Sequence, residues 1–557
     1  MDRINTARHL LPVVASLLLL SGCGSGDASA RRSIRTWDLA ADISILASDE
    51  FEGRAPSSKG EELTIQFLKE EFEKLGLEPG NRGSYFQEVP LVAMTPDFGS
   101  GLVIWGDKTT TRLVYRREYV AWTKRVVEKT SLDRSDLVFV GYGVVAPEWS
   151  WNDYEGLDVR GKTVLILVND PGYATKDSSL FNGNAMTYYG RWTYKLEEAA
   201  RQGAAGAIIV HESGPAGYPW EVVRNSWTGS QFDLVAEDDN LFRSAVEGWI
   251  TEKITRDLFQ QGGQDYDTLK ARAARRGFIP IPLDLKISLT ITNTIRRSTS
   301  HNVLALLPGR KRPDEVLIYT AHWDHLGKDS SLRGDQIYNG ALDNASGVAG
   351  LLELAEAFVA LKRRPARSIL FLAVTVEEQG LLGSQYYATH PVYPLEKTIA
   401  AMNMDGLNIF GPMNDVTLIG YGNSELDDYV IAAARKQRRR VRPDPEMEKG
   451  YFYRSDHFSF AKEGIPALYL DVGIDHVEHG EEWTREQMDK YTAERYHKPS
   501  DEFDPTWDLS GAVDDLRLLF SVGHRLGNET TLPNWREGNE FRAKRDAQLQ
   551  ASGESID

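Results

Sequence analysis

Three apolar runs in the second half of the sequence end in a histidine or in carboxylates. The residues that follow these runs are His322, the pair Glu377 and Glu378, and Asp405. Such runs are typical of strands that are covered on both faces of a parallel sheet. Ligands bind outside the carboxyl ends of strands in open parallel sheets, so we expect these side chains to meet at one edge. Imidazole and carboxylate groups gathered there indicate a metal site.

The two adjacent glutamates are the most informative part of this pattern. Glu377 and Glu378 follow the apolar run 369–376. Two carboxylates at the end of a buried strand are costly unless a metal ion or protons compensate their charge. We therefore expect one glutamate to bind metal, and its neighbour, which points elsewhere, to act as a general base.

Further candidates lie before and after these strand ends. Asp343 precedes an apolar helical pattern, and Ser346, which is closer to that pattern, suffices as its N-cap, so Asp343 is left free. A late imidazole comes from His497. Asp324, two residues after His322, is placed to accept a hydrogen bond from the second ring nitrogen of a metal-bound imidazole.

Composition excludes several classes of protein and of site. The 557 residues include one cysteine and 11 histidines, so an internal disulfide and a multi-cysteine metal site are both excluded. Lys and Arg total 64 and Asp and Glu total 81, which gives a net charge of −17. A chain this acidic repels phosphate backbones, and we expect no nucleic-acid partner. The length and the 41% hydrophobic content indicate a globular protein of more than one domain.

The ordered set of candidates resembles a known family, the co-catalytic zinc aminopeptidases of the MH clan. The residues that carry the resemblance are His322, Asp343, Glu377, Glu378, Asp405 and His497. The family includes bacterial secreted aminopeptidases and relatives with a protease-associated domain, such as glutamate carboxypeptidase and the transferrin receptor. The segment 46–55 also matches, and 140–143, 158–164 and 203–209 resemble the protease-associated domain.

The resemblance implies a fold and a role for each residue. It implies an α/β fold with a mixed, mostly parallel, doubly wound sheet (the zinc exopeptidase fold) and an inserted β-rich protease-associated domain. Two zinc ions are implied, with manganese or cobalt as alternatives. The implied metal ligands are His322 and Asp405 at one ion, Glu378 and His497 at the other, and Asp343 between both. Glu377 is implied as the general base that activates water, and Tyr496 as the donor to the developing oxyanion.

The resemblance and the composition along the chain together divide it into segments. We expect a lipoprotein signal peptide at 1–23, a tether at 24–36, the peptidase domain at 37–130 and 291–535 with the protease-associated insert at 131–290, and a polar tail at 536–557.

The first residues predict export and a lipid anchor. Arg3 and Arg8 precede an apolar run at 10–20 that is too short to span a membrane and fits a secretory signal. The following Leu-Ser-Gly-Cys resembles a bacterial lipobox, in which Cys23 becomes the lipidated first residue. We therefore expect a cell-envelope protein held to the membrane at Cys23. Gly24 after the cysteine favours the outer membrane if the source is Gram-negative.

Other conspicuous residues have ordinary explanations. His325, His476 and His479 match no ligand position, so we expect them to be structural or surface residues. Arg454 to Phe458 resembles a family segment near the substrate pocket, although Ser455 or the next residue also suits a helix cap. A basic cluster closes a helix that opens with acidic residues, an arrangement that suits the helix dipole. Its members are Arg435, Lys436, Arg438, Arg439, Arg440 and Arg442.

The function that these observations predict is a metallo-exopeptidase, an aminopeptidase that acts on peptides. Three alternatives remain at this stage. A carboxypeptidase or dipeptidase would use the same metal site with a different pocket. A glutaminyl cyclase, which is an acyltransferase, is usually described with a single zinc. A receptor-like binding protein would have lost the ligands, all of which are present here.

Overall fold

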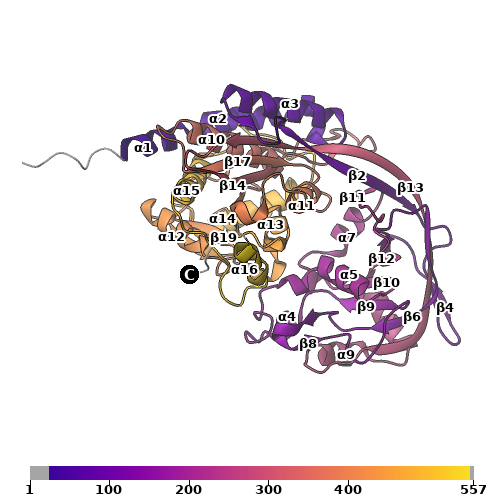
Figure 1. Ribbon diagram of the computed structural model, residues 1–557. Coiled ribbons are helices and arrows are strands. Elements are labelled where there is room, and N and C mark those ends of the chain that lie inside the picture. Colours follow the sequence, from indigo (N-terminus) through magenta and orange to yellow (C-terminus); the bar gives the residue numbers. More distant parts are fainter. Residues whose placement is uncertain (1–23, 552–557) are drawn as a thin grey trace, which may run out of the picture.

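The computed structural model describes residues 24–551 and shows two lobes joined by long strands (Figure 1). Cys23, with the predicted signal peptide, lies outside the described residues. None of the helices between 24 and 551 combines the length and apolar character needed to cross a membrane.

The first lobe is built on a mixed sheet. Its strands are β13 (Ile281–Leu307), β14 (Arg312–His322), β17 (Arg367–Val374), β18 (Thr398–Asn403), β19 (Asp415–Ile419), β20 (Arg440–Pro443) and β21 (Ala467–Asp471). The pairs β17–β14, β14–β18, β18–β21 and β19–β20 are parallel, while β13–β17 and β19–β21 are antiparallel. This mixed, mostly parallel α/β sheet confirms the predicted fold class.

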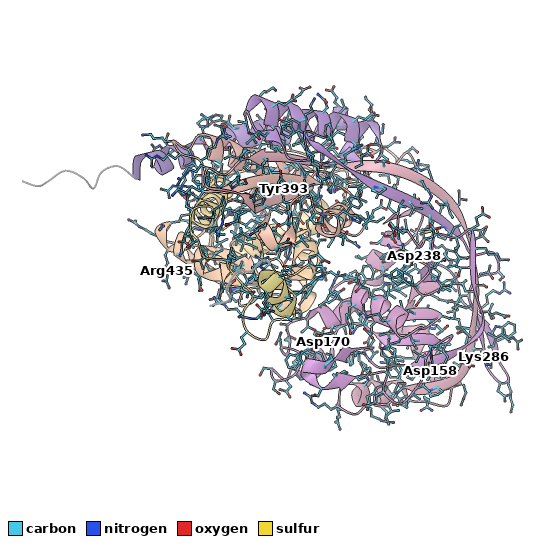
Figure 2. The ribbon with its side chains drawn as sticks, viewed as in Figure 1. Asp158, Asp170, Asp238, Lys286, Tyr393 and Arg435 are labelled. Carbon is cyan, nitrogen blue, oxygen red and sulfur yellow. The ribbon has the colours of Figure 1, made fainter. Side chains whose placement is uncertain are left out.

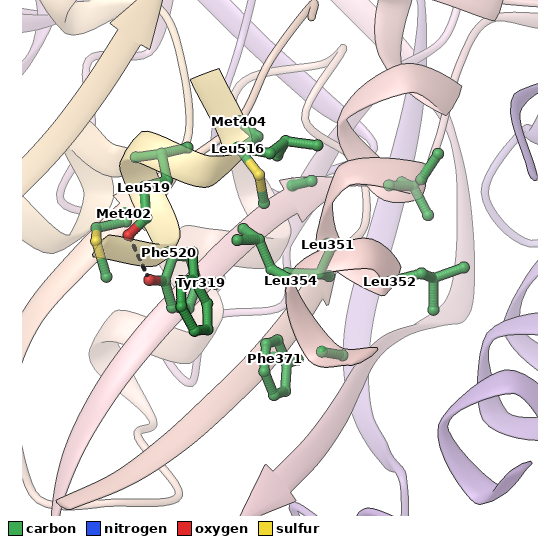
Figure 3. Close-up of a cluster of buried hydrophobic side chains, with 14 of the residues drawn as sticks. Tyr319, Leu351, Leu352, Leu354, Phe371, Met402, Met404, Leu516, Leu519 and Phe520 are labelled. Atoms are coloured by element: carbon green, nitrogen blue, oxygen red, sulfur yellow. Dashed lines mark hydrogen bonds between the residues drawn. The ribbon is translucent and has the colours of Figure 1, made fainter. Parts of the chain in front are cut away.

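Helices cover both faces of this sheet and create its core. The helices are α2 (Thr36–Leu46), α3 (Lys59–Lys74), α10 (Gly347–Val359), α11 (Leu382–Thr389), α12 (Leu426–Lys436), α13 (His457–Lys462), α14 (Gly480–Glu494) and α15 (Ser510–Leu526). Leucines of α10 and α15 pack on aromatic side chains of the central strands (Figure 3). Within this core the Tyr319 hydroxyl donates a hydrogen bond of 2.8 Å to the carbonyl of Leu519, which satisfies a buried polar group.

The second lobe is inserted into the first and has its own core. Its central strands β6 (Lys129–Phe139), β9 (Thr163–Leu167), β10 (Gly206–His211) and β12 (Val246–Thr251) are parallel, and β5 (Tyr119–Trp122) closes the edge. Its main helices are α5 (Trp192–Arg201), α8 (Glu252–Gln261) and α9 (Tyr266–Ala273).

The inserted region begins earlier than the predicted residue 131. Phe98, Leu102 and Leu113 belong to its hydrophobic core, and β5 pairs with β12 inside it. The 27-residue strand β13 runs from one lobe to the other, and β2 (Phe86–Asp97) follows it over 292–303 (Figure 1). The boundary therefore falls where β2 ends, near residue 98.

Both ends of the described chain are folded against the first lobe. The expected tether contains helix α1 (Gly24–Ser33), which packs on α10 and buries Ala30. Arg517 of α15 donates to the carbonyls of Arg31 and Ile34, and so caps the end of α1. The expected polar tail contains α16 (Arg542–Ala551), whose Arg545 is fully buried. The segment expected as a tether is therefore a packed helix, and the segment expected as a polar tail contains a helix with a buried arginine.

Candidate metal centre

Three parallel strands deliver the predicted residues to one edge of the sheet. In the strand register His322 pairs with Val374, and Thr320 pairs with Asn403, so β14, β17 and β18 end together. The residues that gather at this edge, which we call the strand-end cluster, are His322, Asp343, Glu377, Glu378, Asp405 and His497. Asp343 comes from the turn before α10, and His497 follows α14.

Asp343 lies between the two histidines. Its Oδ1 is 3.3 Å from Nε2 of His322, and its Oδ2 is 3.1 Å from Nε2 of His497. Each histidine also faces a second carboxylate: Nε2 of His322 is 3.3 Å from Asp405, and Nε2 of His497 is 3.2 Å from Glu378. The cluster thus contains two groups of one imidazole and two carboxylates, which share Asp343.

The two adjacent glutamates belong to different groups of potential metal ligands. Glu377 lies with His322 and Asp405, whereas Glu378 lies with Asp343 on the other side. The residue before them, Val376, has a φ of 54°. A β-branched residue seldom adopts this left-handed conformation, so the surrounding structure holds a strained turn at the strand end.

Burial and neighbouring charges shift the pKa values of the two glutamates in opposite directions. Burial, together with Asp405 and Glu378, raises the pKa of Glu377 well above its ordinary value, although His322 opposes the shift. Burial also acts to raise the pKa of Glu378, but His497 and His325 outweigh it and hold that pKa at about 2. Carboxyl groups whose pKa values are pushed apart are suited to different roles.

Asp324 supports the cluster through its backbone and its side chain. The carbonyl of Asp324 is 3.1 Å from Nδ1 of His322, while its carboxylate is 3.9 Å away. That carboxylate instead accepts a hydrogen bond of 3.0 Å from the backbone N–H of Glu377. The predicted partner of the ring is therefore the right residue, but the carbonyl makes the short contact.

His325 belongs to the site, which we did not expect from the sequence. It is buried, and its Nδ1 is 2.5 Å from Oε1 of Glu378. Its place three residues after His322, at the end of a strand, was the available signal. His476 and His479 instead stack on each other, 4.7 Å apart, and join no metal-binding group within residues 24–551.

Two buried residues that sequence reasoning left without a role brace the loops of the cluster. The Arg54 guanidinium donates to the carbonyls of Trp323, Asn339 and Gly340, and so ties the His322 loop to the Asp343 loop. The Asp501 carboxylate accepts hydrogen bonds from the backbone N–H groups of Leu342 and Asp343. Arg54 lies in the 46–55 segment and Asp501 follows His497 by four residues.

Two further segments contact the cluster. The Tyr496 ring stacks on the His497 ring at 4.0 Å and is 46% exposed. Ser455 donates a hydrogen bond of 2.5 Å to Asp405, and neither Ser455 nor Asp456 caps α13 with its side chain. The structure therefore favours the site interpretation of the 454–458 segment over the capping one.

The donor set fits zinc. Potential ligand atoms of His322, Glu377 and Asp405 lie within 4.8 Å of one another, as do those of His325, Asp343 and Glu378. Imidazole nitrogen and carboxylate oxygen are the zinc ligands that a chain without a cysteine pair can supply. The carboxylates outnumber the imidazoles, so the cluster carries an excess of negative charge that a cation would neutralise.

The inserted lobe touches the loops around this cluster. Gln379, next to Glu378, accepts a hydrogen bond of 3.1 Å from the backbone of Phe232. On another side, Lys462 pairs with Glu197 at 3.0 Å, and Tyr188 packs on Phe458 at 5.2 Å. These contacts place parts of the inserted lobe beside the strand-end cluster.

Comparison with known proteins places this geometry in a family. Residues 302–520 match Peptidase family M28. The segment matched in the mouse protein "Aminopeptidase NAALADL1" is 30% identical over 168 residues, which are 29% of this chain and 20% of that protein. A "Probable zinc metalloprotease" of Pyricularia oryzae is 46% identical over 87 residues, 16% of this chain and 17% of that protein. The chain thus spans about a fifth of the length of these relatives.

A solved structure covers nearly the whole chain. The aminopeptidase from Aneurinibacillus sp. strain AM-1 aligns with 91% of this chain and 97% of its own, with 20% identity and a TM-score of 0.50. At this identity the alignment supports the fold alone. The region 302–520, which matches Peptidase family M28, contains the whole strand-end cluster.

Proposed function

We propose that the protein is a zinc-dependent aminopeptidase that removes residues from the amino end of peptides and holds two zinc ions in the strand-end cluster. The observation that carries the proposal is Asp343, whose two oxygens face His322 and His497 at 3.3 and 3.1 Å. Support also comes from the family match and from the relatives named as aminopeptidases.

The residues of the chain divide the chemistry between them. Zinc ions, when bound, polarise the scissile carbonyl and lower the pKa of water. The Glu377 carboxylate takes a proton from the attacking water and delivers it to the leaving nitrogen. The Tyr496 hydroxyl donates a hydrogen bond to the developing oxyanion.

Metal content and activity, measured on one preparation, test the proposal. We expect about two zinc ions per chain and release of the anilide from aminoacyl anilides, with loss of activity on chelation and recovery when zinc is restored. One metal per chain with acyl transfer would favour a cyclase. Full metal content with no turnover of any anilide would contradict aminopeptidase action.

One observation favours carboxypeptidase or dipeptidase action as the second candidate. Arg191 of the inserted lobe is 8% exposed, and its side chain makes no ion pair or hydrogen bond within residues 24–551. Burial, and then the nearby Arg454 guanidinium, lower the pKa of Arg191 to about 10. Arg454 immediately precedes Ser455, which contacts Asp405. The two guanidinium groups of Arg191 and Arg454 at the lobe contact suit a substrate carboxylate.

A pair of substrates separates the two candidates. Arg191→Ala should raise KM for a dipeptide with a free carboxyl end and leave KM for its amide unchanged, if that carboxylate binds there. Arg272→Ala, on the exposed surface of the same lobe, is the matched control. Equal effects on acid and amide would remove the carboxylate proposal and leave the aminopeptidase proposal standing.

We also propose that the chain is exported, with lipid attached at Cys23 and the folded body on the membrane surface. Support comes from the apolar run at 10–20 and from the cysteine at the lipobox position. Cys23→Ser should shift the protein out of the membrane fraction after washing with salt, while a variant still anchored would contradict lipidation. Incorporation of labelled palmitate is the direct measurement.

A further inference from the structure

The basic cluster at the end of α12 separates into two halves. One half is neutralised: Arg439 pairs with Asp515, Arg440 with Asp475, and Arg442 with Asp415 and Glu481, at 2.5–2.8 Å. The other half is exposed and makes no ion pair within residues 24–551; it consists of Arg435, Lys436 and Arg438. The helix dipole favours cations in the last turn, but Arg438 lies beyond the helix end at Lys436.

Helix α1 extends this positive surface. Arg31, Arg32, Lys436 and Arg517 line one surface hollow between α1, α12 and α15, and Asp514 is the one carboxylate that lines it in the described part of the chain. Neither Arg31 nor Arg32 forms an ion pair with a residue between 28 and 551. A chain with a net charge of −17 thus presents a local excess of cations on one face. We call it the basic face, defined by Arg31, Arg32, Arg435, Lys436, Arg438 and Arg517.

The basic face includes the helix that directly follows Cys23, and this position indicates a membrane surface as its partner. Cys23 immediately precedes Gly24, the first residue of α1, and Arg517 fastens the other end of α1 to α15. A helix of ten residues spans about 15 Å. A lipid attached at Cys23, as proposed above, would therefore bring the basic face to within that distance of the headgroups.

We propose that the basic face docks on a lipid surface that carries anionic headgroups. Lys and Arg side chains near such a surface attract it, and the attraction decays within a Debye length. The acidic remainder of the protein is repelled, so the two effects together orient the molecule. Figure 2 shows Arg435 at the outer edge of the first lobe, on the side away from the inserted lobe. Docking would leave the inserted lobe facing the solution.

Vesicle binding tests the proposal without the lipid anchor. Residues 24–557, which contain every described helix and strand, are mixed at low ionic strength with vesicles of phosphatidylcholine, with or without phosphatidylglycerol. We expect binding only when phosphatidylglycerol is present, and release by salt. The triple variant Arg435→Gln, Lys436→Gln, Arg438→Gln should lower the partition coefficient about 100-fold.

A second triple variant controls for net charge. Lys108→Gln, Arg272→Gln, Arg275→Gln removes the same charge from exposed positions of the inserted lobe and should bind as the parent does. Unchanged peptidase activity confirms that both variants are folded. Equal binding to both kinds of vesicle, or equal loss in both variants, would overturn the proposal. So would self-association that the first variant abolishes, since this result would assign the face to a second copy of the chain. Because this chain lacks Cys23, its result is independent of whether the anchor exists.

Discussion

Two regions of the molecule bury carboxylates, and they compensate them differently. In the strand-end cluster, Asp343, Asp405 and Glu378 face imidazole nitrogens at 3.1–3.3 Å. In the inserted lobe, Asp153 and Asp170 are buried around Lys195, and no imidazole is among their hydrogen-bond partners. Both regions contain titratable groups with shifted pKa values.

The inserted lobe supplies its own donors. Asp170 accepts hydrogen bonds from the N–H groups of Gly172, Tyr173 and Thr187 and from the Thr187 hydroxyl, at 2.8–3.2 Å. Asp153 accepts from the backbone of Val144 and from the indole of Trp151. These carboxylates are satisfied by neutral donors and therefore need no further ligand. Lys195 lies near both and favours their charged forms, although burial lowers its own pKa to about 7.

The carboxylates of the strand-end cluster have fewer hydrogen-bond donors around them. These carboxylates face one another across the two histidines, and burial, together with nearby Asp405 and Glu378, raises the pKa of Glu377. A cation that neutralises them would stabilise the arrangement. Burial and shifted pKa values are found in both regions, so they do not by themselves identify a metal site. The distinguishing feature is imidazole nitrogen aimed at carboxylates that lack enough donors.

The largest expected effect comes from the general base. Glu377→Gln removes a proton acceptor and should lower kcat about 10²–10⁴-fold, with zinc content nearly unchanged. Glu378→Gln at the next position is the matched comparison, and it should lose zinc as well as activity. Parallel measurement of kcat and bound zinc in both variants separates the roles. Near-normal turnover by Glu377→Gln would end the proposed mechanism.

A buried carboxylate of the inserted lobe should affect the stability of the protein and leave zinc binding unchanged. Asp170→Ala leaves four buried donors without an acceptor and should destabilise the protein by about 3 kcal/mol, with zinc content unchanged. Asp158→Ala, on the surface of the same lobe (Figure 2), should change the free energy of unfolding by less than about 0.5 kcal/mol. Denaturant unfolding checks both. Loss of zinc from Asp170→Ala would show that the two regions are coupled.

Much of the site could be predicted because its residues follow strands with an unambiguous apolar pattern. The runs before His322, Glu377 and Asp405 are buried on both faces, and parallel pairing aligns their ends. The order of the residues then added Asp343 and His497 through the family resemblance. Their roles as ligands stay predictions until metal is measured.

The parts that could not be predicted depend on contacts distant in sequence. Helix α1 is polar, and its end is capped by Arg517, 486 residues from Arg31. Arg54 acts through carbonyls more than 260 residues away, which no local pattern reveals. The lobe boundary was misplaced because β13 crosses it as one continuous strand. His325 was missed because it matches no ligand position of the family, although it lies three residues after His322.

A smaller effect on zinc affinity is expected at Asp324, whose carboxylate accepts a hydrogen bond from the backbone of the cluster. Asp324→Asn alters the acceptor for the Glu377 N–H but keeps the carbonyl that contacts His322 at 3.1 Å. We therefore expect zinc affinity to fall about tenfold, at the lower end of effects seen for residues behind metal ligands. Competition with a zinc chelator measures this value. A counterpart outside the cluster, Asp329→Asn, should leave affinity unchanged, and a loss greater than that of Glu378→Gln would contradict the assignment.

A pH-dependent effect tests a third group of carboxylates, which lies between α2 and α10 and of which Glu353 is buried. Asp38, Glu353 and Glu356 bring carboxylate oxygens within 4.8 Å of one another, without an imidazole. Burial, and then Asp38 and Glu356, raise the pKa of Glu353 to about 8, although the Arg35 N–H opposes the shift. The folded state therefore favours the protonated form. The stability that this gives is complete below the unfolded value near 4.5 and is lost as the pH rises through about 8.

Glu353→Gln should accordingly be neutral at pH 5 and stabilising by about 2 kcal/mol at pH 9, because glutamine keeps an acceptor for the Arg35 N–H and cannot ionise. Calorimetry at the two pH values, in the presence of a chelator and then of zinc, makes the measurement. If this group held a cation as the strand-end cluster is proposed to do, the variant would instead lose stability when zinc is added. A stabilised variant at pH 9 in both conditions would show that carboxylates gathered without imidazole are a source of pH-dependent stability, and that the histidines define the metal site.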